Sequence, residues 1–232
     1  MRSRRCNPFA TRYVRPGAIP WVGDANARLD SIHKRFETLG ERAAVIGPHG
    51  SGKTTLLHHL VPRLLDEWEF IAPDGTSSRR TSDGLKPGRP AGKGTGTWIQ
   101  LRRCQTHGVC ELRPWPIMSR GQLLVLDGLE QLYWHQRFFL LADQFCRRYR
   151  LLVTSHRPSW QIPELWNTSV DAATAVKIIQ HISDASDPGD SGRLELSTNE
   201  LRERLARENG SLREVLMQCY DEYEQTTQSQ SV

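Results

Sequence analysis

The chain has 232 residues, of which 38% are hydrophobic, and a formal net charge of +5. This length allows one domain of ordinary size with a small appendage, and a core that folds without disulfide bonds. The hydrophobic content argues against wholesale disorder, and no stretch reaches the ~18 apolar residues of a membrane helix, so we expect neither a disordered chain nor an integral membrane protein.

The N-terminal segment, residues 1–23, is basic, because it carries five arginines and no acidic residue. Prolines interrupt it, so it lacks the apolar core of ~7–15 residues that a secretory signal needs. We expect a basic surface arm. The five cysteines of the chain, an odd number at scattered positions, do not indicate a disulfide framework, and we expect a reducing, cytoplasmic setting.

Residues 24–182 alternate between strand and helix patterns, which is typical of an α/β domain with a mainly parallel sheet and helices on both faces. A helix is predicted over 24–39, and a buried strand over 43–46 follows it. The next helix begins at residue 54, and Pro62 predicts a kink in it. Further strands are predicted at 69–71, 97–101, 123–126 and 151–153, with a weaker one at 167–170.

Another helix is predicted before the strand at 151–153. Its apolar residues follow the spacing of one helix face: Phe138, Leu141, Ala142, Phe145, Cys146 and Tyr149.

Residues 73–96 are rich in Gly, Pro, Ser and Thr and carry five basic residues against two aspartates, a local charge of +3. This composition predicts a flexible basic insertion in the core, most simply a solvated loop. The alternative is a mobile arm that contacts nucleic-acid phosphates. The insertion has no interleaved aromatic residues for base stacking, which favours the solvated loop. Its basic residues are Arg79, Arg80, Lys86, Arg89 and Lys93.

The C-terminal part of the chain is predicted to be helical. A polar linker over 183–193 leads into a small helical lid over 194–225, and a disordered tail is expected over 226–232. Ser197 and Ser211 each have a glutamate three residues later, which is the spacing of a helix capping box. Residues 194–232 contain four arginines and eight acidic residues, so this part carries a charge of −4.

The segment from Gly47 to Thr54 matches G-x-x-x-x-G-K-[ST] and lies between a predicted strand and a predicted helix. Glycines let such a loop curl so that its N–H groups point at phosphates, and the helix N-terminus adds partial positive charge. We expect Lys53 to reach the β- and γ-phosphates and Thr54 to ligate Mg²⁺. The expected nucleotide contacts are Gly47, Pro48, His49, Gly50, Ser51, Gly52, Lys53, Thr54 and Thr55.

A phosphate loop of this kind needs an acidic residue that holds magnesium at the end of a neighbouring buried strand. Asp127 directly follows the apolar run at 123–126 and matches this Walker B pattern. At least one predicted strand lies between the loop and Asp127 in the sequence. That order favours the additional-strand ATPases over nucleotide kinases.

Several segments together resemble those of STAND and AAA+ ATPases. Residues 126–132 (Leu-Asp-Gly-Leu-Glu-Gln-Leu) and 151–157 (Leu-Leu-Val-Thr-Ser-His-Arg) resemble the Walker B and sensor-1 segments, and residues 209–214 (Asn-Gly-Ser-Leu-Arg-Glu) resemble the sensor-2 segment of AAA+ lids. Residues 7–9 and 19–20 resemble the leader on the adenine side of such proteins. The resemblance covers about residues 7 to 225.

The resemblance implies roles for particular residues. Asp127 would hold Mg²⁺ through water, and Thr154 or Ser155 would sense the γ-phosphate. Arg157 and Arg213 would neutralise charge on the transferred phosphoryl group, although each has the alternative of a surface arginine. His156 is inserted into the usual Thr-Ser-Arg order.

The chain departs from the AAA+ pattern at Gly128, where these ATPases usually have a glutamate base. Glu130 is the substitute candidate for polarising water. Its alternative is a solvated residue at a helix start, stabilised by the helix dipole. We therefore expect slow hydrolysis.

Two histidine and cysteine groups are weaker candidates. Cys104, His107 and Cys110 are close in sequence, but structural zinc wants four ligands, so we interpret the cysteines as ordinary. The adjacent His58 and His59 point about 100° apart on a helix, which does not favour a shared metal ion, and we expect them at the surface or in a groove.

The leading expectation is therefore a P-loop α/β ATPase core with a C-terminal helical lid, binding ATP and Mg²⁺ and acting as a switch or scaffold. No repeat array is present that could act as a sensor, so we expect another protein as sensor or effector, with a homo-oligomer as an alternative. A DNA-associated ATPase that uses the basic loops is a second hypothesis, and a small-molecule kinase is a third.

Overall fold

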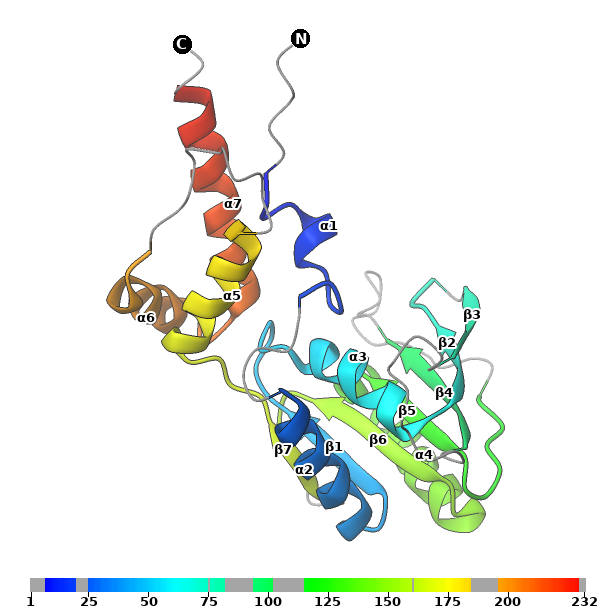
Figure 1. Ribbon diagram of the computed structural model, residues 1–232. Helices are drawn as coiled ribbons and strands as arrows, with labels where there is room; N and C mark the ends of the chain where they lie inside the picture. Colours follow the sequence, from blue (N-terminus) through cyan, green and yellow to red (C-terminus); the bar gives the residue numbers. More distant parts are fainter. Residues whose placement is uncertain are drawn as a thin grey trace. The chain divides into compact units, whose positions relative to one another are not determined.

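A computed structural model describes residues 7–19, 25–74, 76–81, 94–101, 115–159, 161–184 and 196–229. The chain forms two compact units (Figure 1). The sheet unit comprises Asn26–Gly47 and Leu57–Asn167, and the helical unit comprises the described residues of Met1–Ala25, Pro48–Leu56 and Thr168–Val232. The sequence analysis instead places residues 24–182 in one core.

The sheet unit is built on a seven-stranded sheet in the order β3-β2-β4-β5-β6-β1-β7. Every neighbouring pair is parallel except β2 and β3, which are antiparallel. The strands are β1 (Arg42–Ile46), β2 (Glu67–Ile71), β3 (Ser77–Thr81), β4 (Thr95–Gln100), β5 (Leu123–Asp127), β6 (Arg150–Ser155) and β7 (Glu164–Asn167).

The predicted α/β class and mainly parallel sheet are confirmed. All five residues of β5 and the last five of β6 are buried, as expected for strands covered on both faces. The weak strand predicted at 167–170 is displaced, because β7 ends where that prediction begins. Its short burial pattern alternates instead of running continuously, which is why the apolar-run criterion misses it.

The sheet carries helices on both of its faces. Leu140 of α4 (Trp134–Arg147) packs with Leu124 and Leu126 of β5, whereas His58 of α3 (Lys53–Leu64) contacts Trp98 of β4. Trp98 lies opposite Val125 in the register, and successive strand residues point to opposite faces. α3 and α4 therefore cover opposite faces, while α2 (Ala25–Thr38) precedes β1 and the short η1 (Leu129–Gln131) follows β5.

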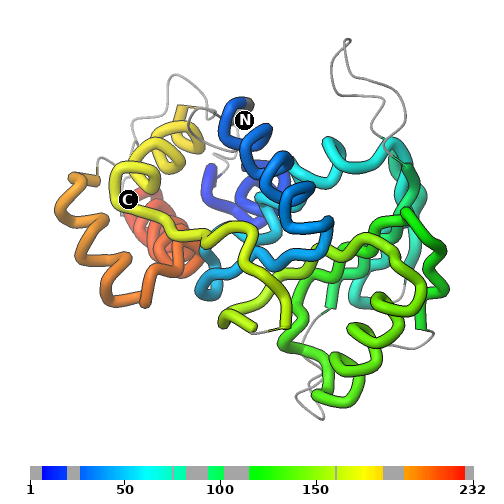
Figure 2. The backbone as a smooth tube through the Cα atoms, turned by 90° about the horizontal axis from the view of Figure 1, so that it is seen from below, coloured from blue at the N-terminus to red at the C-terminus, as the bar shows by residue number. Residues whose placement is uncertain are grey.

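The helical unit contains α1 (Thr11–Val14), α5 (Ala172–Asp184), α6 (Thr198–Arg207) and α7 (Leu212–Ser229). Its core is formed by apolar residues of α5, α6 and α7, and these helices lie together in both views (Figure 1, Figure 2). Ser197 caps α6 by accepting a hydrogen bond from the Glu200 N–H at 3.2 Å. The Ser211 hydroxyl accepts one from the Glu214 N–H at 3.4 Å. Both predicted N-caps are thereby confirmed.

The expected surface arm is anchored at residues 7–9 and 19, whereas residues 11–13 and 15–18 are exposed. Phe9 and Ile19 are buried in the core of the helical unit. The side-chain amide of Asn7 donates hydrogen bonds to the Tyr220 carbonyl at 3.0 Å and to the Glu224 carboxylate at 2.9 Å. The arginine content of the segment obscures these three anchoring residues, which fix it within the helical unit.

Three predicted irregular segments are partly regular. Residues 77–81 of the basic insertion form edge strand β3, whereas Lys86, Arg89 and Lys93 lie outside the described residues. α5 continues through residues 183 and 184 of the predicted linker, and α7 continues through residues 226–229 of the predicted tail. No helix in the described ranges has the length and apolar character needed to cross a membrane.

Candidate functional site

The loop from Gly47 to Gly52 connects the end of β1 to the start of α3. Gly50 and Gly52 have φ values of +68° and +91°, a left-handed conformation that side chains with a Cβ rarely adopt. The loop therefore curls because glycine occupies these two positions. Pro48 and His49 are exposed, while Thr54 and Thr55 are half-buried on the first turn of α3.

Two polar side chains of this loop are buried within the helical unit. The Lys53 ammonium donates a hydrogen bond to the Pro48 carbonyl at 2.7 Å, and the residue is only 9% exposed. The Ser51 and Thr168 hydroxyls are 2.6 Å apart. A lysine folded back over its own loop places positive charge beside the curled backbone, which suits an anionic ligand.

Asp127 ends β5 at the carboxyl edge of the sheet and is buried. Its Oδ1 accepts a hydrogen bond from the Thr154 hydroxyl at 2.7 Å, and its Oδ2 accepts one from the Gln100 amide at 3.3 Å. The Thr154 hydroxyl in turn accepts from the Gly128 N–H at 2.8 Å. The structure thus brings Asp127 and Thr154 together, and the Thr154 hydroxyl orients the Asp127 carboxylate.

Gln100 is a site residue that the sequence analysis missed. It is the last residue of β4 and lies opposite Asp127 in the parallel register. The sequence does contain a signal for Gln100, which is a polar residue at the carboxyl end of an apolar strand. Such strand ends meet at one edge of a parallel sheet, where site residues gather.

His156 bridges two parts of this edge. Its Nε2 lies 2.8 Å from Glu130 Oε1, and its Nδ1 lies 3.2 Å from the Gly47 carbonyl oxygen. The His156 ring therefore ties Glu130 to Gly47, the first residue of the loop that follows β1.

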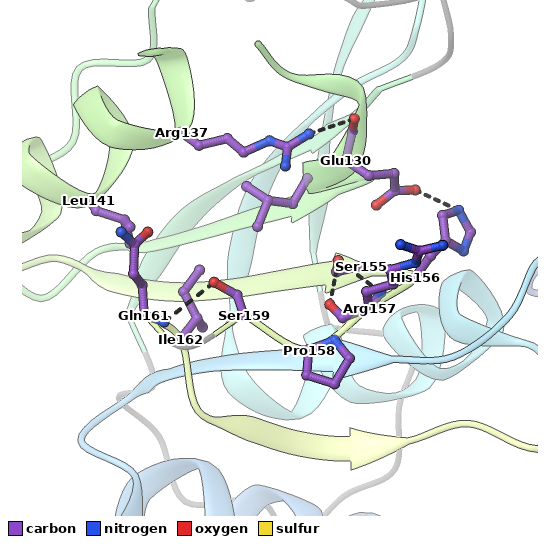
Figure 3. A pocket seen from close by; sticks show the side chains of 11 residues that line it. Glu130, Arg137, Leu141, Ser155, His156, Arg157, Pro158, Ser159, Gln161 and Ile162 are labelled. Atoms are coloured by element: carbon purple, nitrogen blue, oxygen red, sulfur yellow. Dashed lines mark hydrogen bonds and ion pairs between the residues drawn. The ribbon is translucent and has the colours of Figure 1, made fainter. Parts of the chain in front are cut away.

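Glu130 lies at the wall of a cavity of about 370 Å³ in the sheet unit (Figure 3). Its second oxygen, Oε2, is buried and has no hydrogen-bond partner among the described residues. Arg137 donates to the Glu130 carbonyl at 2.8 Å and to the Leu132 carbonyl at 3.0 Å, which fixes the turn that carries the carboxylate. Glu130 is half-buried and lies in the first turn of η1, where the alternative of a residue at a helix start also places it.

Ser155 and Arg157 also line the cavity. The Ser155 hydroxyl donates to the Arg157 carbonyl at 2.9 Å, so it closes the turn after β6. Arg157 itself is exposed. The structure thus collects Glu130, Ser155, His156 and Arg157 around one cavity.

Arg213 belongs to the helical unit, where its backbone lies next to Gly50. A Cβ atom added to Gly50 would lie 3.0 Å from Arg213 Cβ and would also meet the Ser211 hydroxyl. Gly210 approaches the same loop, with its added Cβ 3.8 Å from the Pro48 ring. The first turn of α7 therefore packs directly against the loop, while the Arg213 residue remains exposed.

The predicted surface position of His58 is only partly right, because the residue is half-buried. Burial, together with the positive charge of Arg80, lowers the pKa of His58 to about 4. His58 is therefore neutral near pH 7 and packs edge-on against Trp98, with the ring centroids 4.8 Å apart. The candidate zinc group of Cys104, His107 and Cys110 lies outside the described residues.

No protein-family model matches the chain, and no curated protein matches its sequence.

Proposed function

We propose that this chain is a P-loop NTPase that binds ATP with Mg²⁺ and works as a nucleotide-dependent switch or scaffold. The observation that carries the proposal is the segment Gly47–Thr54. It combines the G-x-x-x-x-G-K-[ST] sequence with left-handed glycines, a buried lysine and a position between a buried parallel strand and a helix. Phosphate groups are the ligands that such a loop accommodates.

The side chains present suit magnesium, which prefers oxygen ligands and keeps several waters. The Thr54 hydroxyl would ligate the ion, and Asp127 would hold it through water. Both oxygens of Asp127 already accept hydrogen bonds from Thr154 and Gln100, so the carboxylate is oriented in advance. Bound Mg²⁺ would neutralise charge on the β- and γ-phosphates.

The strand order supports the AAA+/STAND type over a nucleotide kinase. β6 lies between the loop strand β1 and the strand of Asp127, β5, which is the additional strand expected for these ATPases. The contact between the loop and the first turn of α7 in the helical unit supports a lid that responds to the nucleotide, in which Arg213 would read its phosphates.

Slow hydrolysis follows from the acidic residues present. Gly128 stands where a base is usual, and Glu130 is paired with His156. Glu130 would polarise water, and His156 would set the direction of its carboxylate. Such an enzyme would hold one nucleotide state long enough for another protein, or another copy of the chain, to respond.

Nucleotide binding is tested by titrating wild type and Lys53→Ala with a fluorescent ATP analogue in the presence of Mg²⁺. Charge-assisted hydrogen bonds contribute about 1.5–3 kcal/mol each, so Lys53→Ala should weaken binding about 10- to 100-fold or more. Lys34→Ala, an exposed lysine on α2, is the control and should bind like wild type. Equal binding by Lys53→Ala, or no binding by wild type, would contradict the proposal.

The alternatives are separated by turnover assays on the same protein. The switch predicts turnover below the enzyme median of ~10 s⁻¹, without phosphate transfer to an acceptor. The exposed Arg79 on edge strand β3 is the observation that favours the DNA-associated ATPase. Charged residues on an edge strand also prevent edge-to-edge pairing of sheets, which is a second explanation for Arg79. Hydrolysis that DNA stimulates would favour the DNA-associated ATPase over the switch.

A further inference from the structure

The cavity beside Glu130 has more basic than acidic side chains in its wall. Among the described residues that line it, Arg137, His156 and Arg157 are basic and Glu130 is the acidic one. The Glu130 Oε1 lies 2.8 Å from His156 Nε2, and its Oε2 is buried. The two guanidinium groups therefore supply the charge that a ligand in the cavity would meet.

Arg137 is held in place by backbone carbonyls and not by a carboxylate. Its Nη2 and its Nε donate to the carbonyls of Glu130 and Leu132. These neutral acceptors fix the plane of the guanidinium but leave its charge without a counter-charge. Its Nη1 takes part in neither bond, and Figure 3 shows the half-buried guanidinium at the wall of the cavity.

Arg157 reaches the same cavity from another element. It follows β6, whereas Arg137 lies on α4, and both side chains line the cavity (Figure 3). Within the described ranges, neither guanidinium forms an ion pair with an acidic side chain. A guanidinium presents parallel N–H donors that match the oxygens of a carboxylate or a phosphate. Two such groups at one cavity favour an anionic ligand.

The rest of the cavity wall includes apolar residues that belong to the core of the sheet unit. Leu129 and Ile162 are buried members of this core, and Leu141 packs against it. The volume of about 370 Å³ lies at the small end of the ~300–1,000 Å³ of ligand pockets. An apolar wall with a few charged groups is also the usual composition of such pockets. The cavity therefore suits a small molecule with an apolar body and a charged end.

We propose that this cavity binds a small organic anion. Its carboxylate or phosphate group lies between Arg137 and Arg157, and its apolar body lies against Leu129, Leu141 and Ile162. The proposal does not depend on nucleotide binding, because every residue that lines the cavity belongs to the sheet unit and lies outside the loop 47–54.

The test is an NMR titration of the isotope-labelled full chain with phenyl phosphate, without nucleotide. Backbone amide signals within residues 129–162 should shift and saturate, with a Kd on the order of 1 mM for so small a ligand. Benzyl alcohol keeps the ring without the charge, and inorganic phosphate keeps the charge without the ring. Each should bind at least about tenfold more weakly than phenyl phosphate, because each lacks one of the two kinds of contact.

Variants of the two arginines test the position of the anionic group. Arg157→Gln and Arg137→Gln should each weaken the binding of phenyl phosphate by about tenfold or more, because each removes a charge-assisted contact. Arg120→Gln changes an exposed arginine of the same unit that does not line the cavity. This control should bind like wild type. Thermal melts establish that each variant is folded.

Arg157→Gln decides the test even if Arg137→Gln loosens the turn that Arg137 holds. The Arg157 side chain makes no hydrogen bond or ion pair in the part of the chain that the structure describes, so its replacement leaves the fold intact. Binding by Arg157→Gln equal to that of wild type would overturn the proposal. So would the absence of saturable shifts in wild type up to about 10 mM phenyl phosphate.

Lys53→Ala separates this site from the proposed nucleotide site. The variant should lose ATP but should bind phenyl phosphate like wild type, because Lys53 does not line the cavity. Loss of phenyl phosphate binding in Lys53→Ala would place the probe in the loop 47–54 and overturn the cavity site. Benzoate, titrated in parallel, identifies the preferred anion: tighter binding than phenyl phosphate assigns a carboxylate ligand, and weaker binding assigns a phosphate ligand.

Discussion

The most informative residue of the candidate site is His156, which the sequence presents only as an interruption of a familiar order. In the structure it links Glu130 to the Gly47 carbonyl, so the acid that could act on water is tied to the loop that could hold phosphate. The cavity beside it contains the buried, unpartnered Oε2 of Glu130, as judged among the described residues. These contacts make Glu130 and His156 one functional pair in the proposed mechanism.

We expect Glu130→Gln to lower ATP turnover by about 100-fold or more, in the range for loss of a general base, and to leave ATP affinity nearly unchanged. His156→Ala should act in the same direction but less strongly, because the carboxylate remains and loses only its orientation. Single-turnover hydrolysis and equilibrium binding separate the two effects. The double variant should be no slower than Glu130→Gln, and additive losses would show that the two residues act independently.

The pKa of His58, lowered to about 4 chiefly by burial, predicts an acid-dependent loss of stability. The unfolded chain takes up this proton near pH 6.5 and the folded chain only near pH 4, so stability falls as the pH drops through that interval. His58→Phe keeps the ring against Trp98 and should show a shallower fall. Urea unfolding across this interval measures it, with His181→Gln, an exposed histidine, as control. Parallel pH curves for wild type and His58→Phe would contradict the assignment.

At the scale of elements, the contact between the phosphate loop and the start of α7 is the feature most relevant to a switch. Ser211 begins α7 as its N-cap and is buried, and Gly50 lies against it with no room for a side chain.

α4 shows what an apolar pattern predicts about a helix and what it does not. Apolar spacing correctly predicts the helix, but it does not tell which side faces the core.

Gly50→Ala should destabilise the helical unit by about 1–3 kcal/mol, because a Cβ meets Ser211 and Arg213 and because φ is positive there. Gly40→Ala is the matched control. Its φ of +71° imposes a similar backbone strain, but nothing lies within 4 Å of the added Cβ. Thermal melts without nucleotide should show the larger loss for Gly50→Ala. Equal losses would mean that backbone strain alone, and not the contact with α7, limits this position.

At the scale of the whole molecule, the chain passes between the two units at residues 25–26, 47–48, 56–57 and 167–168. A ligand that binds only the folded chain stabilises it by mass action.

Saturating ATP with Mg²⁺ should raise the free energy of unfolding by about 2.7 kcal/mol at a concentration of 100 times Kd. Chelation of the metal, or Asp127→Asn, should remove much of this gain, because the phosphates then lack their counter-charge. Thermal melts with and without EDTA measure it, with Asp143→Asn on α4 as the control that keeps the gain. A gain that persists unchanged with EDTA would contradict the role of magnesium.

Much of this protein is determined by local sequence. Buried parallel strands appear as apolar runs because both of their faces are covered, so β1, β5 and β6 are predictable from residues 43–46, 123–126 and 151–153. The curled loop between β1 and α3 is predictable for a similar reason, since its glycines meet a local backbone requirement at Gly50 and Gly52. Asp127 follows from its place at the end of an apolar strand.

Other features depend on contacts between residues distant in the sequence, and only the tertiary structure decides them. Asn7 and Phe9 are buried because partners from the C-terminal helices surround them, although they sit in an arginine-rich segment. Gln100 and His156 become site residues because parallel pairing and a loop carbonyl bring partners to them. Which side of α4 is exposed depends on which side packs against the sheet. The apolar periodicity is the same for either side, so it does not predict this.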